Sequence, residues 1–359
     1  MATRIQIRRD TAANWTLNNP TLASGEIGLE TDTNQIKIGN GSSNWGALSY
    51  FSTYTNEQAQ DAVGSILTDS PSVDFTYNDG SNAITANVIW PLLDITKPPY
   101  NAVGDGVTDC TTAINDAIDD IITMGYGTIY MPAGDFYTTG LHEPPSNCVF
   151  RGAGMDVTRL IWQDGDHCFV NIANKSEIEF CDFSIIGRWD SNRTQGTKFP
   201  FLVYNIDEIK FFRVGVDYSR SMSIAVRACD TAVAVDCRIR WSAVDAISFI
   251  DTANYIISNN VITHCGDNAI ACHCTDSIAD PVRSNGLIIG NRLSQTCCIN
   301  ALGGKLLVIS HNTATLCLGY GVSISYVDTE GNTPPIGVII SANVITDIIK
   351  ANSIYFFHS

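Results

Sequence analysis

The 359-residue sequence predicts an all-β protein, most of which is a parallel β-helix: a single-chain solenoid of stacked coils of roughly 20–25 residues. Two series of apolar residues recur at intervals of 23: Val216, Ile239 and Ile262, and Ile224, Ile247 and Ile270. Four short β-type strings each end in asparagine, at Asn260, Asn291, Asn312 and Asn343. Runs such as NYIIS are almost wholly apolar, as expected of parallel strands buried inside a coil.

Composition and charge limit the possible partners. The chain is 45% apolar, which is typical of a globular protein. Its formal net charge of −16 argues against nucleic acid and against an anionic lipid surface as partners. No run approaches 18 apolar residues, so no membrane insertion is expected. The N-terminal string MATRIQIRRD lacks the apolar core of a secretory signal.

The cysteines are distributed unevenly. All twelve lie between Cys110 and Cys317, without the short regular spacing of a secreted disulfide scaffold. Because free cysteine is a favoured small buried residue, we expect mostly reduced core cysteines in a protein made in a cytoplasm. No cofactor is predicted.

Residues 1–50 alternate short β-type runs with turns and predict a small β-rich module. The alternation is clear at Ile5 and Ile7 and again at Ile36 and Ile38. A GEIG element, followed by KIGNG and Trp45, resembles the N-terminal module of phage tail-fibre and tropism-determinant proteins. The resemblance implies a virion-attachment module, usually trimeric, that binds phage tail or baseplate proteins.

Residues 51–90 predict a connector made of one helix and one hairpin. The string YTNEQAQDAVGSIL (54–67) has an apolar stripe at helical spacing, and DFTYNDGSNAITANVIW predicts a hairpin around residues 78–80. The segment resembles the connectors of tail fibres. A linker hairpin of another origin is the alternative.

The third region, residues 91–359, opens with turns and an amphipathic helix. One apolar face follows the spacing i, i+3, i+4, i+7 and i+8: Ile114, Ala117, Ile118, Ile121 and Ile122. Asp109 or Thr111 can cap the start of this helix, and Gly125 fits the position after its end. The glycines around Asp105 predict a tight turn rather than a phosphate-binding loop, because no Lys-Ser/Thr follows them.

Residues 97–165 resemble the entry of the pectate-lyase-like superfamily. The matching elements are NAVGDGVTD, the helix, a YMPAG strand and an RGAG turn, with Asn101 in place of the usual first glycine and Cys110 where a second aspartate is common. The resemblance implies a right-handed parallel β-helix whose N-terminal end is capped by the helix.

The four asparagines predict a structural ladder. Stacked asparagines at equivalent corners can hydrogen-bond to one another and to the backbone of the adjacent coils. Their gaps are 31, 21 and 31 residues, and the longer gaps contain CTDSIADPVRSNG and VDTEGNTPP, which we expect to be loops at one corner.

Asp245 and Asp267 are the candidate catalytic residues. In a 23-residue register Asp245 stacks on Asn268, so Asp267 lies one position earlier on the next coil. The two strings, VDAI and GDNAI, resemble the polygalacturonase pattern, which implies that Asp245 is a water-activating base and Asp267 the general acid. That pattern has a second aspartate where Asn268 stands, and its following His-Gly is absent here. A purely structural or solvated role for the pair is the alternative.

Candidate substrate-binding residues face outward on nearby coils: Asp236, Arg240, Trp241 and Tyr218, with Asp217 as a further outward candidate. An exposed aromatic ring beside carboxylates suits sugar stacking, whereas core packing is the alternative for both rings. No metal site is predicted for the stretch from His264 to Cys274. Alternation along a strand sends Cys272 inward and His273 outward, and the spacing matches no standard zinc arrangement.

Together these patterns predict a phage tail fibre or tailspike that is made in the host cytoplasm and carried in the virion. The resemblance to tail fibres implies a homotrimer, and we expect it to recognise a host-surface polysaccharide as a receptor-binding protein. The alternative is an active depolymerase, a glycoside hydrolase or polysaccharide lyase, so the sequence leaves enzymatic activity open. A cellular polysaccharide lyase is disfavoured by the N-terminal module.

Overall fold

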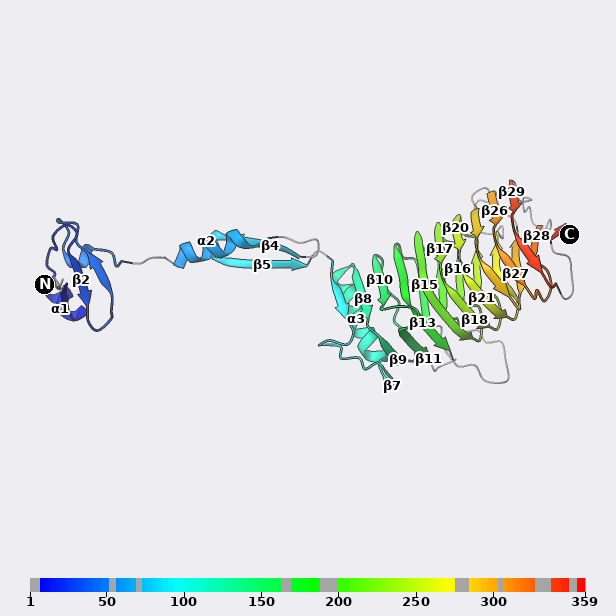
Figure 1. The fold of residues 1–359 in the computed structure, drawn as a ribbon, viewed down its shortest axis with the longest axis horizontal. Coiled ribbons are helices and arrows are strands. Elements are labelled where there is room, and N and C mark those ends of the chain that lie inside the picture. The colour runs from blue at the N-terminus through cyan, green and yellow to red at the C-terminus, as the bar shows by residue number, and fades with distance from the viewer. Residues whose placement is uncertain are drawn as a thin grey trace, which may run out of the picture. The chain divides into compact units, whose positions relative to one another are not determined.

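The structure is a computed structural model that describes residues 7–51, 56–68, 73–88, 90–162, 169–187, 199–274, 284–302, 306–326, 337–348 and 354–358 (Figure 1). The chain divides into two compact units, Met1–Ile89 and Trp90–Ser359. No helix in the described part is long and apolar enough to cross a membrane.

The first unit begins with a small three-stranded sheet and two short helical segments: β1 (Arg8–Asp10), α1 (Ala12–Asn18), β2 (Ile27–Glu30), β3 (Ile36–Ile38) and η1 (Trp45–Ala47). The rings of Trp15 and Trp45 stack at 4.1 Å and form its core with two leucines. A side chain on Gly28 would collide with the Trp45 ring, which explains why the GEIG element and the tryptophan occur together. Ile5, half of one predicted alternation, lies outside the described residues.

The predicted connector is a helix followed by a hairpin: α2 (Asn56–Ile66), β4 (Val73–Asn78), η2 (Asp79–Ser81) and β5 (Ala83–Val88). The hairpin is confirmed, and its reversal extends to Asn82, which adopts the left-handed conformation that asparagine tolerates. The first two residues of the predicted helix lie outside the described part of the chain. No residue of α2 is buried, so its apolar stripe is uncovered in the described structure.

The second unit is a right-handed parallel β-helix with three strand faces (Figure 1). An eight-stranded sheet, called sheet I here, contains β12 (Val170–Ala173), β14 (Phe201–Tyr204), β16 (Ile224–Arg227), β19 (Ile247–Ile250), β22 (Asn268–His273), β25 (Cys297–Leu302), β28 (Val322–Tyr326) and β31 (Ile354–His358).

The other two faces belong to one 18-stranded sheet that bends at a corner. Sheet II contains β6 (Leu92–Asp94), β8 (Gly127–Met131), β10 (Cys148–Gly152), β17 (Thr231–Val235), β20 (Asn254–Ser258), β23 (Asn285–Ile289), β26 (Leu306–Ser310) and β29 (Val338–Ser341). Sheet III contains β7 (Asp105–Asp109), β9 (Gly134–Thr138), β11 (Thr158–Trp162), β18 (Arg238–Ser242), β21 (Val261–Cys265), β24 (Arg292–Ser294), β27 (Thr313–Thr315) and β30 (Val344–Thr346). Two long strands, β13 (Ile178–Gly187) and β15 (Glu208–Ser219), run through both faces.

The predicted 23-residue register is confirmed. Ile247 pairs with Ile224 on one side and Ile270 on the other, and Ile239 pairs in the same way with Val216 and Ile262. All of these side chains are buried, so each coil contributes the same apolar positions to a continuous core.

The capping helix is α3 (Thr111–Met124). Cys110 holds the N-cap position, rather than Asp109 or Thr111, but the Asp109 carboxylate accepts from the backbone N–H of Thr111, the first helical residue, at 2.8 Å. Gly125 follows the end of the helix in the left-handed conformation at φ +85°. The predicted apolar face needs one correction: Ile122 is half exposed, because successive residues turn by 100° and place it at the edge of the stripe.

The asparagine ladder is confirmed at the corner between sheets II and III. The Oδ1 atoms of Asn291, Asn312 and Asn343 each accept from both the backbone N–H and the Nδ2 of the preceding ladder residue, at 2.9–3.0 Å. Asn260 Oδ1 accepts from the Cys237 backbone N–H at 2.8 Å. Each Nδ2 also donates to a backbone carbonyl inside the coil, as Asn291 does to Ile257. The two predicted corner loops fall mainly on 275–283 and 327–336, outside the described residues.

Most of the described cysteines lie inside the core, as expected. Cys168 lies outside the described residues.

Candidate functional site

The candidate site lies at the corner where sheet III passes into sheet I. On one coil β18 ends at Ser242 and β19 begins at Ile247, and the next coil repeats this passage with β21 and β22. The Ser242 hydroxyl donates to the Asp245 backbone carbonyl at 2.8 Å and closes the turn. The corner therefore carries Trp241 at its start and Asp245 at its end.

The Asp245 carboxyl is buried, with 4% of the residue exposed. Its Oδ1 accepts from the Asn268 backbone N–H and from Asn268 Nδ2, both at 3.0 Å. The amide oxygen of Asn268 accepts in turn from the Tyr320 hydroxyl at 2.5 Å. The predicted stacking of Asp245 on Asn268 is present, and it is extended by a tyrosine from two coils further along.

Asp267 lies beside this chain of hydrogen bonds and is exposed. Its backbone carbonyl accepts from the Thr296 hydroxyl at 2.8 Å, which fixes the turn that carries it. Burial raises the pKa of Asp245 to about 6, and the nearby Asp267 charge adds to the rise against the hydrogen bonds from Asn268. The corner thus combines a carboxyl group that can exchange a proton near neutral pH with a second carboxyl group open to solvent. We call Asp245, Asp267, Asn268 and Tyr320 the acid cluster.

The outer face of sheet I continues the polar surface beyond the acid cluster. His273, at the end of β22, has its Nε2 3.3 Å from Asn300 Nδ2 on β25. Burial lowers the pKa of His273, although the charges of Asp267 and Asp251 act in the opposite direction. A neutral imidazole therefore lies on the same sheet as the acid cluster.

Tyr218, Trp241 and His264 form a column on three consecutive coils, which we call the aromatic column. The pairing of Asp217 with Arg240, and of Arg240 with Thr263, places the three next to one another in register. The Trp241 and His264 rings stack at 3.9 Å with 22° between their planes. Tyr218 is 42% exposed and Trp241 is half-buried, so neither belongs to the core and the core-packing alternative is wrong for both.

All three residues of the aromatic column have left-handed backbone conformations, with φ between 60° and 64°. The corner requires this conformation on other coils too, where it is adopted by Gln295, Leu316 and Asp347. The corner between sheets II and III also carries left-handed residues, and they are of several types, such as Asn259, Gly290, His311 and Ala342. The left-handed conformation is therefore a general feature of the corners of the coil.

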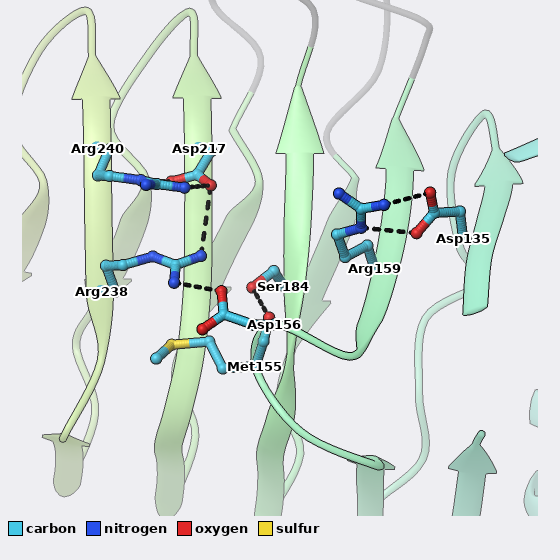
Figure 2. Close-up of polar contacts among 8 residues, drawn as sticks. All are labelled: Asp135, Met155, Asp156, Arg159, Ser184, Asp217, Arg238 and Arg240. Carbon is cyan, nitrogen blue, oxygen red and sulfur yellow. Dashed lines mark hydrogen bonds and ion pairs between the residues drawn. The ribbon is translucent and has the colours of Figure 1, made fainter. Parts of the chain in front are cut away.

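Arg240, the third candidate substrate-binding residue at this corner, forms an ion pair with Asp217. Its Nε lies 2.7 Å from Asp217 Oδ1. The outward position predicted for Asp217 is wrong, because its carboxylate is almost fully buried between Arg238 and Arg240. Figure 2 shows Arg238, two residues earlier on the same strand, beside the same carboxylate. Its Nη2 lies 3.5 Å from Asp217 Oδ2. Arg240 is therefore held in a fixed orientation beside Tyr218 and Trp241.

A turn from a distant coil covers this ion pair. Asp156, in the turn between β10 and β11, pairs with Arg238, which lies 82 residues later in the sequence (Figure 2). The neighbouring Met155 carbonyl accepts a hydrogen bond from the Ser184 hydroxyl on β13. The RGAG turn predicted from the sequence thus fastens the first coils to the middle of the solenoid.

Asp236 is separated from the other candidates. It occupies the corner before β18, whereas Trp241 and Arg240 lie at the far end of that strand. Asp236 is exposed, with φ of 54°. The structure therefore brings three of the four predicted substrate-binding residues together and leaves Asp236 on another edge.

The histidines and cysteines between His264 and Cys274 lie on opposite sides of their strands, as strand alternation predicts. Cys265 and Cys272 are buried, whereas His264 stacks on Trp241 at the surface and His273 faces Asn300.

Sequence reasoning missed Tyr320 and Asn300. Tyr320 reaches Asn268 from 52 residues away, after a stretch in which the coil length varies, so its spacing carries no signal. Asn300 pairs with Ala271 on the next coil, but the interval of 29 residues departs from the regular 23, so its position was hidden in the same way.

The second unit is a right-handed parallel β-helix in which Asp245 and Asp267 precede strands of sheet I. These features define the class of this protein as a pectate-lyase-like solenoid. Residues 99–285, about half of the chain, match the family model described as rhamnogalacturonase A/epimerase, pectate lyase-like. The chain belongs to this family. Residues 223–359 also match the right-handed β-helix region.

The N-terminal residues match a different family model. Residues 5–43 match the major tropism determinant N-terminal domain, which confirms the resemblance to phage tropism-determinant modules.

Two curated relatives match a short part of the chain. Mannuronan C5-epimerase AlgE5 of Azotobacter vinelandii is 39% identical over 80 residues, which is 20% of this chain and 8% of that protein. Alginate lyase 7 of the same organism is 40% identical over 73 residues, 18% of this chain and 8% of that protein. The chain therefore matches less than a tenth of the length of these relatives.

Two solved structures share the fold. The A-module of Azotobacter vinelandii mannuronan C-5 epimerase AlgE6 has a TM-score of 0.53 at 17% identity, covering 74% of this chain and 79% of that one. The exopolygalacturonase of Thermotoga maritima has a TM-score of 0.54 at 13% identity, covering 74% of this chain and 76% of that one. At such identities the likeness concerns the fold alone.

Proposed function

We propose that this protein is a phage tail fibre or tailspike whose β-helix binds a host-surface polysaccharide as the receptor. The observation that carries the proposal is the presence, on one chain, of a tropism-determinant N-terminal domain and a pectate-lyase-like β-helix. The N-terminal domain would attach the protein to the phage tail or baseplate, and the assembled fibre would be a homotrimer made in the host cytoplasm.

The aromatic column is the proposed binding surface. Its residues lie on consecutive coils, which are spaced by about 4.8 Å, the distance between neighbouring strands. A linear glycan lying parallel to the solenoid axis could place successive pyranose rings against Tyr218, Trp241 and His264. The Trp241 and His264 rings stack face to face, so a glycan along the solenoid axis would contact the outward edges of these rings, and the fixed Arg240 can donate hydrogen bonds beside them.

The test uses the surface polysaccharide of the strain on which the phage forms plaques. Wild-type protein should bind it in a pull-down or by calorimetry, and W241A should weaken binding at least tenfold. Y126A is the matched control, because Tyr126 is another partly exposed aromatic residue of the same unit but lies beside α3. Equal binding by wild type and W241A would exclude the aromatic column as the binding surface.

The acid cluster favours a second candidate function, cleavage of the bound polysaccharide. Glycosidic cleavage needs a proton donor and a second carboxylate that acts as base or nucleophile. A pKa of about 6 suits Asp245 to hold and donate a proton, and the solvent-exposed Asp267 could activate water. These roles are the reverse of those implied by the polygalacturonase resemblance, because Asp245 is the buried member of the pair.

The two functions are separated by incubating the protein with the same polysaccharide and measuring new reducing ends and unsaturated sugars. Cleavage that is lost in both D245N and D267N would establish a depolymerase and overturn a purely passive spike. Binding without any product would leave receptor recognition as the function and exclude the depolymerase. Unsaturated products would indicate a lyase rather than a hydrolase.

A further inference from the structure

Two buried cysteines face one another on consecutive coils of the β-helix. Cys298 lies in β25, and Cys317 lies between β27 and β28. Their sulfur atoms are 2.7 Å apart, and neither residue is exposed to solvent. Two sulfur atoms at this distance are closer than ordinary van der Waals contact, and the bonded distance is only slightly shorter, at about 2.05 Å.

This contact differs from those of the other described cysteines. The sulfurs of Cys237 and Cys229 contact backbone carbonyls, and those of Cys265 and Cys272 contact side-chain hydroxyls. Within the described residues, Cys298 and Cys317 make the one sulfur–sulfur contact. Cys297, the immediate neighbour of Cys298, is partly exposed on the other side of the strand. Strand alternation therefore selects one of two adjacent cysteines for the contact.

A cross-link between Cys298 and Cys317 would stabilise the coils in which they lie. It joins the coil of β25 to the coil of β28, and the strands that follow in sheets II and III, β29 and β30, are only half covered. Each coil of a solenoid is held only by its neighbours, so weakly covered coils open first. A covalent link between these coils would oppose such opening.

We propose that Cys298 and Cys317 form a disulfide bond once the protein meets an oxidising environment. The proposal rests on the contact between the two sulfurs and is independent of the proposed function. Burial raises the pKa of the Cys317 thiol, so thiolate is scarce in the folded solenoid. The bond therefore forms most readily while the chain folds in the presence of an oxidant.

With oxidised glutathione as the oxidant, the reaction is two thiol–disulfide exchanges. One cysteine thiolate attacks a glutathione sulfur, breaks the glutathione disulfide and releases one glutathione thiolate. The second cysteine thiolate then attacks the protein sulfur of the mixed disulfide and releases the other glutathione. Both cysteines are oxidised, one molecule of oxidised glutathione is reduced to two thiols, and the two cysteine protons pass to them.

Peptide mapping of the full chain tests the proposal. The protein is produced in cells with a reducing cytoplasm and in cells with an oxidising one, denatured in iodoacetamide, and digested with trypsin without reduction. Cleavage after Arg292, Lys305 and Lys350 separates the two cysteines, so the disulfide joins peptide 293–305 to peptide 306–350. We expect the joined peptides from oxidising cells and carbamidomethylated peptides from reducing cells.

Variants identify the sulfur atoms that form the bond. C297S should keep the joined peptides, and C298S and C317S should lose them. Oxidised wild type should also melt several degrees above reduced wild type, a difference that C317S abolishes. Carbamidomethyl groups on both Cys298 and Cys317 in soluble protein from oxidising cells would overturn the proposal. A bond from Cys297 to Cys317, identified by fragmenting the joined wild-type peptides in the mass spectrometer, would overturn it as well, and neither wild-type result depends on the folding of a variant.

Discussion

At the scale of single residues, the protonation of Asp245 is linked to the stability of the folded protein. The folded protein raises its pKa from 3.8 to about 6, mainly through burial. The folded state therefore binds the proton more tightly than the unfolded chain does. The stability linked to this proton is fully present below about pH 4 and is lost as the pH rises through about 6.

The variant D245N tests this linkage. Its amide oxygen can still accept both hydrogen bonds from Asn268, but it carries no proton to lose. We expect D245N to be more stable than wild type at pH 7 by about 2–3 kcal/mol and to lose the decline in stability between pH 4 and 6. Urea unfolding at several pH values measures both effects. D207N, which alters an exposed carboxylate on the same unit, should keep the wild-type decline.

The ion pairs on sheet III offer a second prediction at this scale (Figure 2). Asp217 is buried between two arginines, so D217A leaves both cations without their shared partner. We expect a loss of about 2 kcal/mol, less than for a fully buried pair because Arg240 is half exposed. D135A, which breaks the more exposed pair with Arg159, should cost about 0.5 kcal/mol. If D217A and D135A lowered the free energy of unfolding equally in denaturant, burial would not explain the strength of the ion pairs of Asp217.

At the scale of structural elements, the corners hold the coils in register. Asn291 has no exposed surface, and its Oδ1 accepts from both the backbone and the side chain of Asn260. N291A leaves these two donors buried without an acceptor, so we expect a loss of about 3–4 kcal/mol in the free energy of unfolding. N254A removes an exposed asparagine stack with Asn285 and should cost less than about 1 kcal/mol.

These elements also show what the sequence could predict. The residues Ile224, Ile247 and Ile270 repeat at a constant interval, so the register and the stacking of Asp245 on Asn268 followed directly from the sequence. Contacts that depend on irregular coils did not follow, because a variable loop removes the constant interval. Tyr320 is therefore absent from the predicted site.

The contact between Asp156 and Arg238 was unpredictable for another reason. It joins a turn to a strand several coils away, and no periodic pattern relates residues 82 positions apart. The same limit applies to Arg240: its sequence position identified an outward cation, but not its bond to Asp217. Outward-facing residues can thus be recognised from alternation, whereas their partners depend on how distant turns fold back.

At the scale of the whole molecule, the two compact units have separate cores. The core of the β-helix starts at Ile95, and the tryptophan core of the N-terminal module ends at Leu48. Because neither core contributes a residue to the other, each unit should unfold by its own transition. In the proposed function one unit attaches the protein to the phage and the other recognises the polysaccharide. This arrangement requires the two units to fold independently.

A fragment containing residues 90–359 tests the independence. We expect it to fold and to melt in calorimetry within about 2 °C of the corresponding transition in the full chain, because every buried residue of the β-helix core is retained. It should bind the host polysaccharide as the full chain does, yet fail to incorporate into phage particles, since the tropism-determinant domain is missing. As soluble competitor, the fragment should reduce phage adsorption in proportion to its concentration. A fragment that melts far below the full chain would show that the N-terminal unit stabilises the solenoid, and the two units would then have to be treated as one cooperative structure.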